Sequence, residues 1–456
     1  VDSAGYGLWQ LKTIQLNDFS GTFYLAFEGK TNLGWGTCLD DIKIIESGIQ
    51  VRHLDAVTVQ QADTSFVGNN TRQNPVLRID FKVSGNQGAV PVNSMSFESL
   101  NQSDSDIGLN GVNLFATNDT FFVNSHPIDA AKNFSSGAVT FNFSNYNLNT
   151  GHNYFWLTYD VDSSAQVGRT LDAKVLANSF SINGSTYPAV DQSPAGSRTI
   201  YTSIFNDDFE KLRGWELSGE FQIDSCRGLG GATMGYPDPA RAFSGGKVLG
   251  TDLNGLGSYK GDYEPGITSA NAYIAKSPLI NCKYFKNINL RFMEWLNFDN
   301  ADDTRIEIST DNGVSWTPFW IKDGFKRDHL WHPADFNLSS FADRQQNISI
   351  RYNLDYSDND WQFSGWNIDD FLLSGYHITR DVGISRIVYP ANGCGHGNGE
   401  GIRVVVKNYG DGPSPASIPV GFSLDGGKTF ISETINQVIA KDDSVSYTFS
   451  SKVDLH

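Results

Sequence analysis

Residues 365–371 read Gly-Trp-Asn-Ile-Asp-Asp-Phe, so two adjacent carboxylates, Asp369 and Asp370, lie within an apolar segment typical of a buried strand. Charged side chains are rarely buried without partners, because removing an ion from water is unfavourable. We therefore expect this acidic pair to have a structural or a binding role.

A second stretch repeats this pattern near the start of the chain. Residues 34–42 contain Gly-Trp and end in Asp-Asp-Ile. Upstream of both stretches, in residues 8–19 and 330–341, a Leu-Trp dipeptide is followed by a Phe ten residues after the Trp. The sequence therefore predicts one apparently complete module and, before it, the C-terminal part of a related one.

The composition limits the class of protein. A chain of 456 residues can form about three domains. Its formal net charge of −17 and pI near 4.8 argue against nucleic acid and anionic membrane surfaces as partners. An acidic chain rich in Asn, Asp and Gly is typical of calcium-binding proteins, although solubility alone explains it too. Abundant aromatic and Gly residues predict an all-β protein with many turns.

The four cysteines form no C-x-x-C pair, so neither a zinc site nor a dense disulfide framework is indicated. Cys226 and Cys282 fall within one predicted domain, and their spacing leaves both a disulfide and two free thiols open. No apolar run approaches the ~20 residues that span a bilayer. Since the chain also has no initiator Met or signal peptide, we expect it to be part of a larger exported protein.

The segment 48–202 shows the alternating pattern of half-buried strands. Residues 75–83, 138–143 and 153–161 alternate apolar and polar side chains, and residues 110–124 predict a further hairpin. Strands separated by short Asn, Ser and Gly turns favour a β-sandwich of the immunoglobulin type.

Three stretches of this segment carry a resemblance to a known family. Residues 77–80, 154–161 and 194–198 resemble the small domain that precedes sialidase-type repeats in secreted proteins of Bacteroidetes. The resemblance implies an accessory, non-catalytic role.

The segment 203–378 opens with an Asp-Phe-Glu stretch at residues 208–210 and closes with the Asp-Asp-Phe stretch at residues 369–371. It resembles the complete MAM-like, or cleaved-adhesin, jelly roll. That resemblance implies that the first and last strands lie side by side and that a cation, usually calcium, lies between their carboxylates. The implied calcium ligands are Asp208, Glu210, Asp369 and Asp370, with Asp252 as a weaker candidate from a preceding loop.

Calcium is chemically reasonable at these residues, because a hard divalent cation takes oxygen ligands from several strands and offsets the charge of buried carboxylates. In the alternative interpretation, the acidic side chains cap strand ends and accept hydrogen bonds from backbone amides.

The two ends of the chain are interpreted in the same way. Residues 1–47 are expected to be the C-terminal strands of a truncated MAM-like jelly roll. The segment 379–456, through residues 401–410 and 418–427, resembles CARDB-like immunoglobulin repeats and is expected to be cut short. The predicted fold class is therefore all-β, with tandem β-sandwich domains of jelly-roll and immunoglobulin-like types.

Two stretches fit the Asp-box pattern S-x-D-x-G-x-x-W. They are residues 309–316 and, with Phe in place of Trp, residues 423–430. The pattern predicts a β-hairpin in which Asp and Gly form the turn and the aromatic residue packs beneath it. Sialidase propellers also contain such boxes, but two boxes in two predicted domains do not make a propeller. The metallopeptidase H-E-x-x-H, the G-x-S-x-G elbow and the Walker loop do not occur, so we expect no enzymatic activity.

Residues 355–363 form a polar insertion relative to the N-terminal copy, and they include the candidate ligand-binding residues Tyr356 and Trp361. An aromatic ring in such a loop can stack on a sugar or anchor a protein partner. The alternative is that Trp361 folds back and covers the core.

The sequence as a whole indicates a non-catalytic segment of a secreted or surface-anchored bacterial adhesin with calcium-stabilised modules. Its expected partners are an extracellular glycan or protein and other domains of the same polypeptide, without nucleic acid and without membrane insertion. The rival hypothesis is the accessory region of a large secreted hydrolase, a sialidase or a peptidase, whose catalytic domain lies outside these residues.

Overall fold

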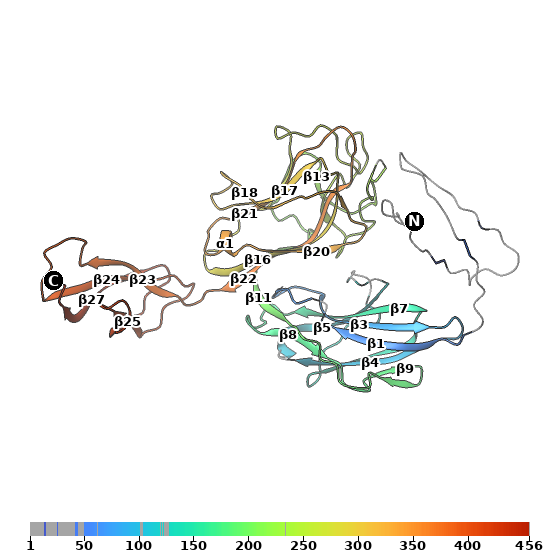
Figure 1. Ribbon diagram of the computed structural model, residues 1–456, viewed down its shortest axis with the longest axis horizontal. Coiled ribbons are helices and arrows are strands. Elements are labelled where there is room, and N and C mark those ends of the chain that lie inside the picture. Colours follow the sequence, from blue (N-terminus) through green and yellow to red (C-terminus); the bar gives the residue numbers. More distant parts are fainter. Residues whose placement is uncertain are drawn as a thin grey trace. The chain divides into compact units, whose positions relative to one another are not determined.

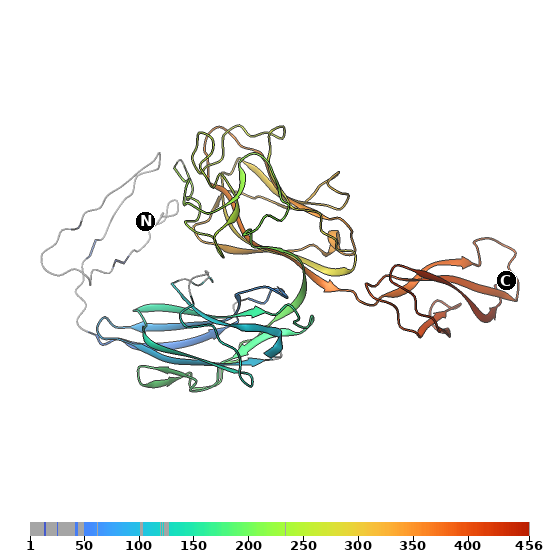
Figure 2. The same ribbon diagram turned by 180° about the vertical axis from the view of Figure 1, so that it is seen from behind.

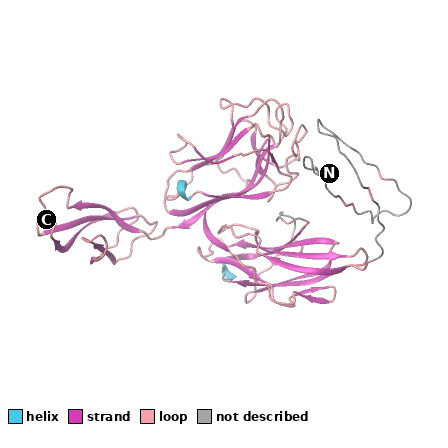
Figure 3. Cartoon of the chain, in the orientation of Figure 1, coloured by secondary structure: helices cyan, strands magenta, loops and turns pink. Residues whose placement is uncertain are grey.

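The protein is described by a computed structural model covering residues 13–14, 25, 42–43 and 50–455, except residues 62, 101–103, 119, 121, 123–126 and 233. The fold set out below belongs to residues 49–456, which form one compact unit. Strands dominate it, and among the described residues its helical elements are the short α1 (Ser339–Ala342) and the 3-10 turn η1 (Asp104–Asp106) (Figure 3). The all-β prediction is confirmed. The partial module predicted for residues 1–47 lies almost wholly outside the described residues.

The first domain is a sandwich of two sheets, antiparallel except for the parallel pair of β2 with β11 (Figure 1). One sheet has the strand order β1 (His53–Gln60), β3 (Asn74–Ser84), β7 (Gly151–Val161) and β5 (Ile107–Thr117). The other has the order β10 (Ser185–Tyr187), β9 (Phe180–Ile182), β4 (Pro91–Leu100), β8 (Thr170–Lys174) and β11 (Arg198–Asp207), with β6 (Ala138–Asn147) beside β4 and β2 (Val67–Gly68) beside β11.

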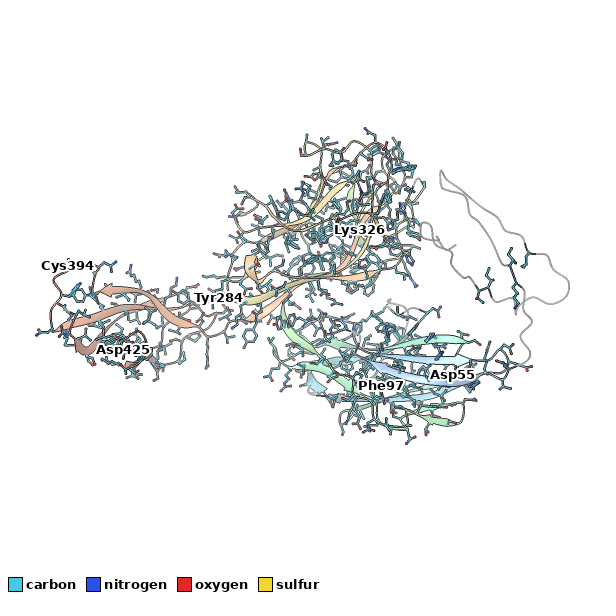
Figure 4. The ribbon with its side chains drawn as sticks, viewed as in Figure 1. Asp55, Phe97, Tyr284, Lys326, Cys394 and Asp425 are labelled. Atoms are coloured by element: carbon cyan, nitrogen blue, oxygen red, sulfur yellow. The ribbon has the colours of Figure 1, made fainter. Side chains whose placement is uncertain are left out.

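The core of this sandwich is aromatic. Buried rings of Phe81, Phe97 and Phe155 pack edge to face or tilted against their neighbours, and Phe97 is labelled in Figure 4. The three strands expected at residues 75–83, 138–143 and 153–161 are present as parts of β3, β6 and β7. Of the hairpin expected at residues 110–124, β5 forms the first arm, and several residues of the second arm lie outside the described residues.

The second domain is also built from two sheets. One contains β22 (Gly365–His377), β14 (Val248–Thr251), β13 (Phe221–Asp224), β16 (Phe285–Phe298), β19 (Lys326–Arg327) and β20 (His332–Asn337). The other has the order β12 (Glu216–Leu217), β15 (Tyr273–Lys276), β21 (Ser349–Tyr356), β17 (Asp303–Ser309) and β18 (Thr317–Ile321).

The C-terminal domain is smaller. Its sheets are β23 (Val382–Tyr389), β24 (Glu400–Asn408) and β27 (Ser444–Val453), and the hairpin of β25 (Ile418–Phe422) with β26 (Ile431–Ile435). It contacts the second domain near Tyr284, which is labelled in Figure 4, where Asp442 accepts hydrogen bonds from Lys283 Nζ at 2.6 Å and from the Tyr284 hydroxyl.

Strand β22 occupies the centre of its sheet, because it pairs with β16 along one edge and with β11 and then β14 along the other. A strand that is covered on both faces reads as a nearly continuous apolar run, which explains the sequence around Trp366. Gly365 adopts a φ of +81°, and a Cβ there would lie 2.8 Å from Thr251 Oγ1, so only glycine fits this position.

Strand β11 belongs to two domains at once. Its first residues pair with β8 and β2 of the first domain, and the stretch from Thr202 to Asp207 pairs with β22 from Gly375 to Phe371. The same strand can be followed from one sandwich into the other in Figures 1 and 2. The first and last strands of the second domain therefore lie side by side, as the family resemblance implied.

An ion cluster joins the same two domains. Asp63 of the first domain lies 3.2 Å from Arg198 Nη1 and 2.7 Å from Arg291 Nη2 of the second domain. Arg291 also pairs with Asp335 at 3.0 Å. Arg198 is only 1% exposed, so its guanidinium depends on Asp63 for charge compensation.

Both Asp boxes form the predicted hairpin turns. In the first, Gly313 N donates to Ser309 Oγ at 2.8 Å and Ser315 N donates to Asp311 Oδ1 at 2.9 Å, between β17 and β18. In the second, Asp425, labelled in Figure 4, accepts from Thr429 N at 2.9 Å between β25 and β26. The hairpin turns are confirmed, but the aromatic residue packs at the turn only in the first box, where Trp316 Nε1 donates to Gly313 O at 3.2 Å, whereas Phe430 of the second box is 64% exposed.

The question left open for Cys226 and Cys282 is resolved in favour of free thiols, and Cys394 is also free. Among the described residues, no helix is both long enough and apolar enough to cross a membrane.

Candidate functional site

The acidic pair of β22 lies in a β-bulge. The register against β16 shifts where Asp369 faces Met293 and Leu372 faces Arg291, and Asp370 has a φ of +49°. A bulge changes the direction in which neighbouring side chains point, so two successive residues can approach the same partner. That partner is Ser244, whose N–H donates to Asp369 Oδ2 at 2.9 Å and whose hydroxyl donates to Asp370 Oδ1 at 2.6 Å.

The predicted ligands from the first strand lie near this pair. Asp208 directly follows Asp207, which faces Phe371, and it is close enough for its charge to act on Asp370. Burial, together with the Asp208 carboxylate, raises the pKa of Asp370 to about 6, against the opposing effects of the Ser244 hydroxyl and of Arg291. Pairing of β11 with β22 thus brings Asp208 and the acidic pair together.

Glu210 and Asp252 have other partners. Glu210 Oε1 accepts hydrogen bonds from Gly246 N at 2.6 Å and Lys247 N at 2.8 Å, in the loop that also carries Ser244. Asp252 is fully buried and accepts from Gly261 N at 2.6 Å and from the Leu256 amide, within its own loop. These hydrogen bonds from backbone amides are the ones expected if the acidic side chains have a structural role in place of binding calcium. Calcium at Asp208, Glu210, Asp252, Asp369 and Asp370 stays a prediction.

A different acidic group is better placed for an ion. Among the described residues, the group of three carboxylates whose ligand atoms all lie within 4.8 Å of one another consists of Asp299, Asp302 and Asp358. Strand β16 ends at Phe298, opposite Lys326 of β19, which is labelled in Figure 4, and Asp299 follows it. Asp302 immediately precedes β17, and Asp358 follows β21.

Hydrogen bonds fix the middle member of this group. Asp302 is 1% exposed and accepts from the Tyr263 hydroxyl and, at 3.0 Å, from Asp358 N. Burial raises the pKa of Asp302 to about 6, and the nearby carboxylates of Asp299 and Asp358 act in the same direction, while the two hydrogen bonds oppose the rise. The site therefore holds negative charge at an energetic disadvantage that a cation would relieve.

The sequence interpretation missed Asp299 and Asp302. They lie in a dense acidic stretch, residues 298–303, that follows a long strand, and this was a usable signal. Asp358 falls within the insertion at residues 355–363, which the sequence singled out for its aromatic residues instead.

The two candidate ligand-binding aromatics differ in exposure. Tyr356, at the end of β21, is 44% exposed. Trp361 is half-buried and packs against the core of the second domain, as the alternative interpretation expected. The ring available to a ligand in this loop is therefore that of Tyr356.

No family model matches this chain, and no curated protein matches it. Among solved structures, it is similar to carbohydrate-binding modules of the beta-sandwich superfamily, at 10% identity over 72% of this chain and 99% of the other, with a TM-score of 0.25. A tandem CBM22 domain from Paenibacillus barcinonensis gives 10% identity over 71% and 93%, with a TM-score of 0.23. The glycoside hydrolase domain of Endo-D from Streptococcus pneumoniae R6 gives 11% identity over 52% of this chain and only 36% of its own, with a TM-score of 0.20. Likenesses of this size do not indicate a function.

Proposed function

We propose that this chain is a non-catalytic segment of a secreted or surface-anchored bacterial adhesin, in which β modules act as spacers and present a binding surface for an extracellular glycan or protein. The observation that supports this proposal most strongly is the strand β11, which is hydrogen-bonded into both the first and the second domain. Domains joined by a flexible linker move independently, whereas domains that share a strand keep one spacing.

The rigidity of this junction has a direct test. With spin labels introduced as unnatural amino acids at Leu109 and Val314, which are 88% and 84% exposed, we expect a single narrow distance distribution between the domains by electron–electron double resonance. The shared strand and the Asp63 ion cluster are the physical reason. A broad or multimodal distribution would rule out the spacer role, and a label pair within the first domain alone provides the reference width.

The binding surface is assigned to the end of β21 and the loop that follows it, because Tyr356, the last residue of β21, is 44% exposed. Aromatic rings bind sugars by stacking and bind proteins as interface anchors. Contacts with the rest of the second domain hold this loop in place. Ser357 N donates to Ile267 O at 3.1 Å, and Trp361 packs on the core.

We expect Tyr356→Ala to lower the affinity for the ligand by about 10-fold or more, as loss of a single aromatic anchor does. Glycan arrays and binding to extracellular host proteins, with the wild-type chain on the same arrays, provide the measurement. Tyr376→Ala is the matched control, because Tyr376 is 41% exposed in the same domain but lies near the end of β22. Equal loss in both variants, or unchanged binding in Tyr356→Ala, would contradict the assignment.

A further inference from the structure

We propose that Asp299, Asp302 and Asp358 form a Ca²⁺ site, which fastens the loop between β21 and β22 to the loop between β16 and β17. The site lies away from the acidic pair of β22 and shares none of the ligands expected from the sequence. Its three carboxylates come from two separate loops, and their ligand atoms lie within 4.8 Å of one another.

The clearest sign of a missing ligand is Asp299. This side chain is only 5% exposed, and its Oδ1 has no hydrogen-bond donor among the described residues. Its other oxygen, Oδ2, accepts from Ala301 N at 3.2 Å. A buried carboxylate oxygen without a donor is strongly unfavourable, so an ion at this position would satisfy a group that the protein itself leaves unsatisfied.

Lys322 offsets the charge of the group only in part, through its coulombic interaction with Asp302 and Asp299. Lys322 Nζ donates to the backbone oxygens of Asp299 at 2.6 Å, Asn300 at 3.2 Å and Gly324 at 3.1 Å. An ammonium group has three hydrogens, so these three bonds use all of them. Lys322 therefore donates no hydrogen bond to the three carboxylates, and its single positive charge leaves most of their negative charge to a second cation.

The donor set selects the kind of ion. All three side chains offer carboxylate oxygens, and the group contains no His or Cys. Oxygen-only sites favour Ca²⁺, Mg²⁺ or Mn²⁺ over zinc and copper. Ca²⁺ accepts six to eight oxygen ligands in flexible geometry, whereas Mg²⁺ demands a nearly ideal octahedron, so a site shared between two irregular loops suits Ca²⁺.

The position of the site gives the ion a role in ligand binding. Asp358 lies between Tyr356 and Trp361, and its N–H already donates to Asp302 Oδ1 at 3.0 Å. An ion held by Asp299, Asp302 and Asp358 would therefore add a second link, beside this hydrogen bond, between the loop of Asp299 and the loop that directly follows Tyr356. This inference stands on the carboxylate geometry, and it holds or fails independently of the ligand of Tyr356.

Titration of the whole chain with CaCl₂ by calorimetry, and with Tb³⁺ by luminescence, tests the proposal. Tyr263 contacts Asp302 through its hydroxyl, so excitation of this ring is expected to sensitise Tb³⁺ bound at the site. We expect the chelator-treated wild-type chain to bind Ca²⁺ and Ca²⁺ to displace Tb³⁺. Asp299→Asn and Asp358→Asn should each weaken binding by about 10-fold or more, because each removes one ligand charge.

Asp238→Asn is the matched control, since Asp238 is a carboxylate of the same domain, 3% exposed, that belongs neither to the proposed site nor to the calcium ligands expected from the sequence. Its Ca²⁺ affinity at this site should equal that of the wild type. Asp358 is the more exposed ligand, so Asp358→Asn keeps the test valid should Asp299→Asn fail to fold, as judged by near-ultraviolet circular dichroism. Absence of Ca²⁺ binding in the wild type, unchanged affinity in Asp358→Asn, or loss of Tb³⁺ luminescence in Asp238→Asn alone would each overturn the assignment.

Discussion

Asp63→Asn is expected to lower the free energy of unfolding by about 3–5 kcal/mol, because it leaves a buried guanidinium without its carboxylate partner. Arg198 is 1% exposed, and Asp63 lies 3.2 Å from its Nη1. Asp63 also pairs with Arg291 across the domain junction at 2.7 Å. Urea denaturation followed by intrinsic fluorescence measures the change, and the label pair across the junction should show a broader distance distribution in this variant.

The pH dependence of stability provides a second test of the role of Asp63. Burial alone would raise the pKa of Asp63, but the guanidiniums of Arg198 and Arg291, together with hydrogen bonds from the Ser65 hydroxyl and N–H, outweigh it and lower the pKa to about 2. A carboxyl group whose pKa is lower in the folded state stabilises the protein above its ordinary pKa, and this contribution is lost as the pH falls toward 2. Asp63→Asn should therefore flatten the acid limb of the stability curve.

Asp335→Asn is the control for this prediction. Asp335 pairs with Arg291 at 3.0 Å, but its side chain is 46% exposed, and exposed ion pairs contribute about 1 kcal/mol or less. The same loss of stability in both variants would show that the cluster acts as a whole, and it would contradict the special role given to the buried pair of Asp63 with Arg198.

Local sequence patterns predicted the strands and turns well, because those features depend on neighbouring residues. The alternation in residues 75–83 marked β3, and the Asp boxes marked the turns around Asp311 and Asp425. The family resemblance added a long-range feature that no pattern supplies, the pairing of β11 with β22. Neither source indicated that β11 also belongs to the first domain, since strand partners separated by many residues leave no local signal.

The acidic site was harder to predict because carboxylates are frequent in this chain. The acidic pair Asp369 and Asp370 is conspicuous in sequence because it lies in an apolar strand. In the structure, however, both carboxylate oxygens of Asp369 already accept hydrogen bonds, from Ser244 N and Asp370 N. The acidic stretch that contains Asp299 and Asp302 follows a long strand, but nothing in it points to a third carboxylate more than fifty residues later in the chain. Only the fold shows that the loop carrying Asp358 returns to meet them. A carboxylate becomes informative through burial and missing donors, and neither property can be read from the residue type.

Glu294→Gln is expected to make the protein more stable than the wild type at alkaline pH, by up to about 3 kcal/mol. Glu294 lies on β16, and its side chain is 13% exposed. Burial raises its pKa from 4.5 to about 7, with a further rise from Asp328, while His332 and Lys326 oppose the change. Gln has nearly the same shape without the charge, so the variant removes the titration while retaining the packing.

The direction of the effect follows from the sign of this shift. A carboxyl group whose folded-state pKa is raised stabilises the protein at low pH, and the contribution is lost as the pH rises through about 7. The wild type should therefore lose stability between pH 5 and pH 8.5. His332, 3.8 Å away, acts in the same direction: burial lowers its pKa, but Asp328 and Glu294 raise it by more, so its contribution is also lost as the pH rises.

Urea denaturation at a series of pH values between 5 and 8.5 measures the two profiles. The difference in free energy of unfolding between Glu294→Gln and the wild type should grow in favour of the variant as the pH rises from 5 to about 7, and it should level off above that. Glu216→Gln is the matched control, because the Glu216 side chain is 71% exposed and its pair with Lys276 lies at the surface. Parallel profiles for Glu294→Gln and the wild type would mean that Glu294 is already ionised in the folded protein, with His332 and Lys326 compensating its charge across this whole range.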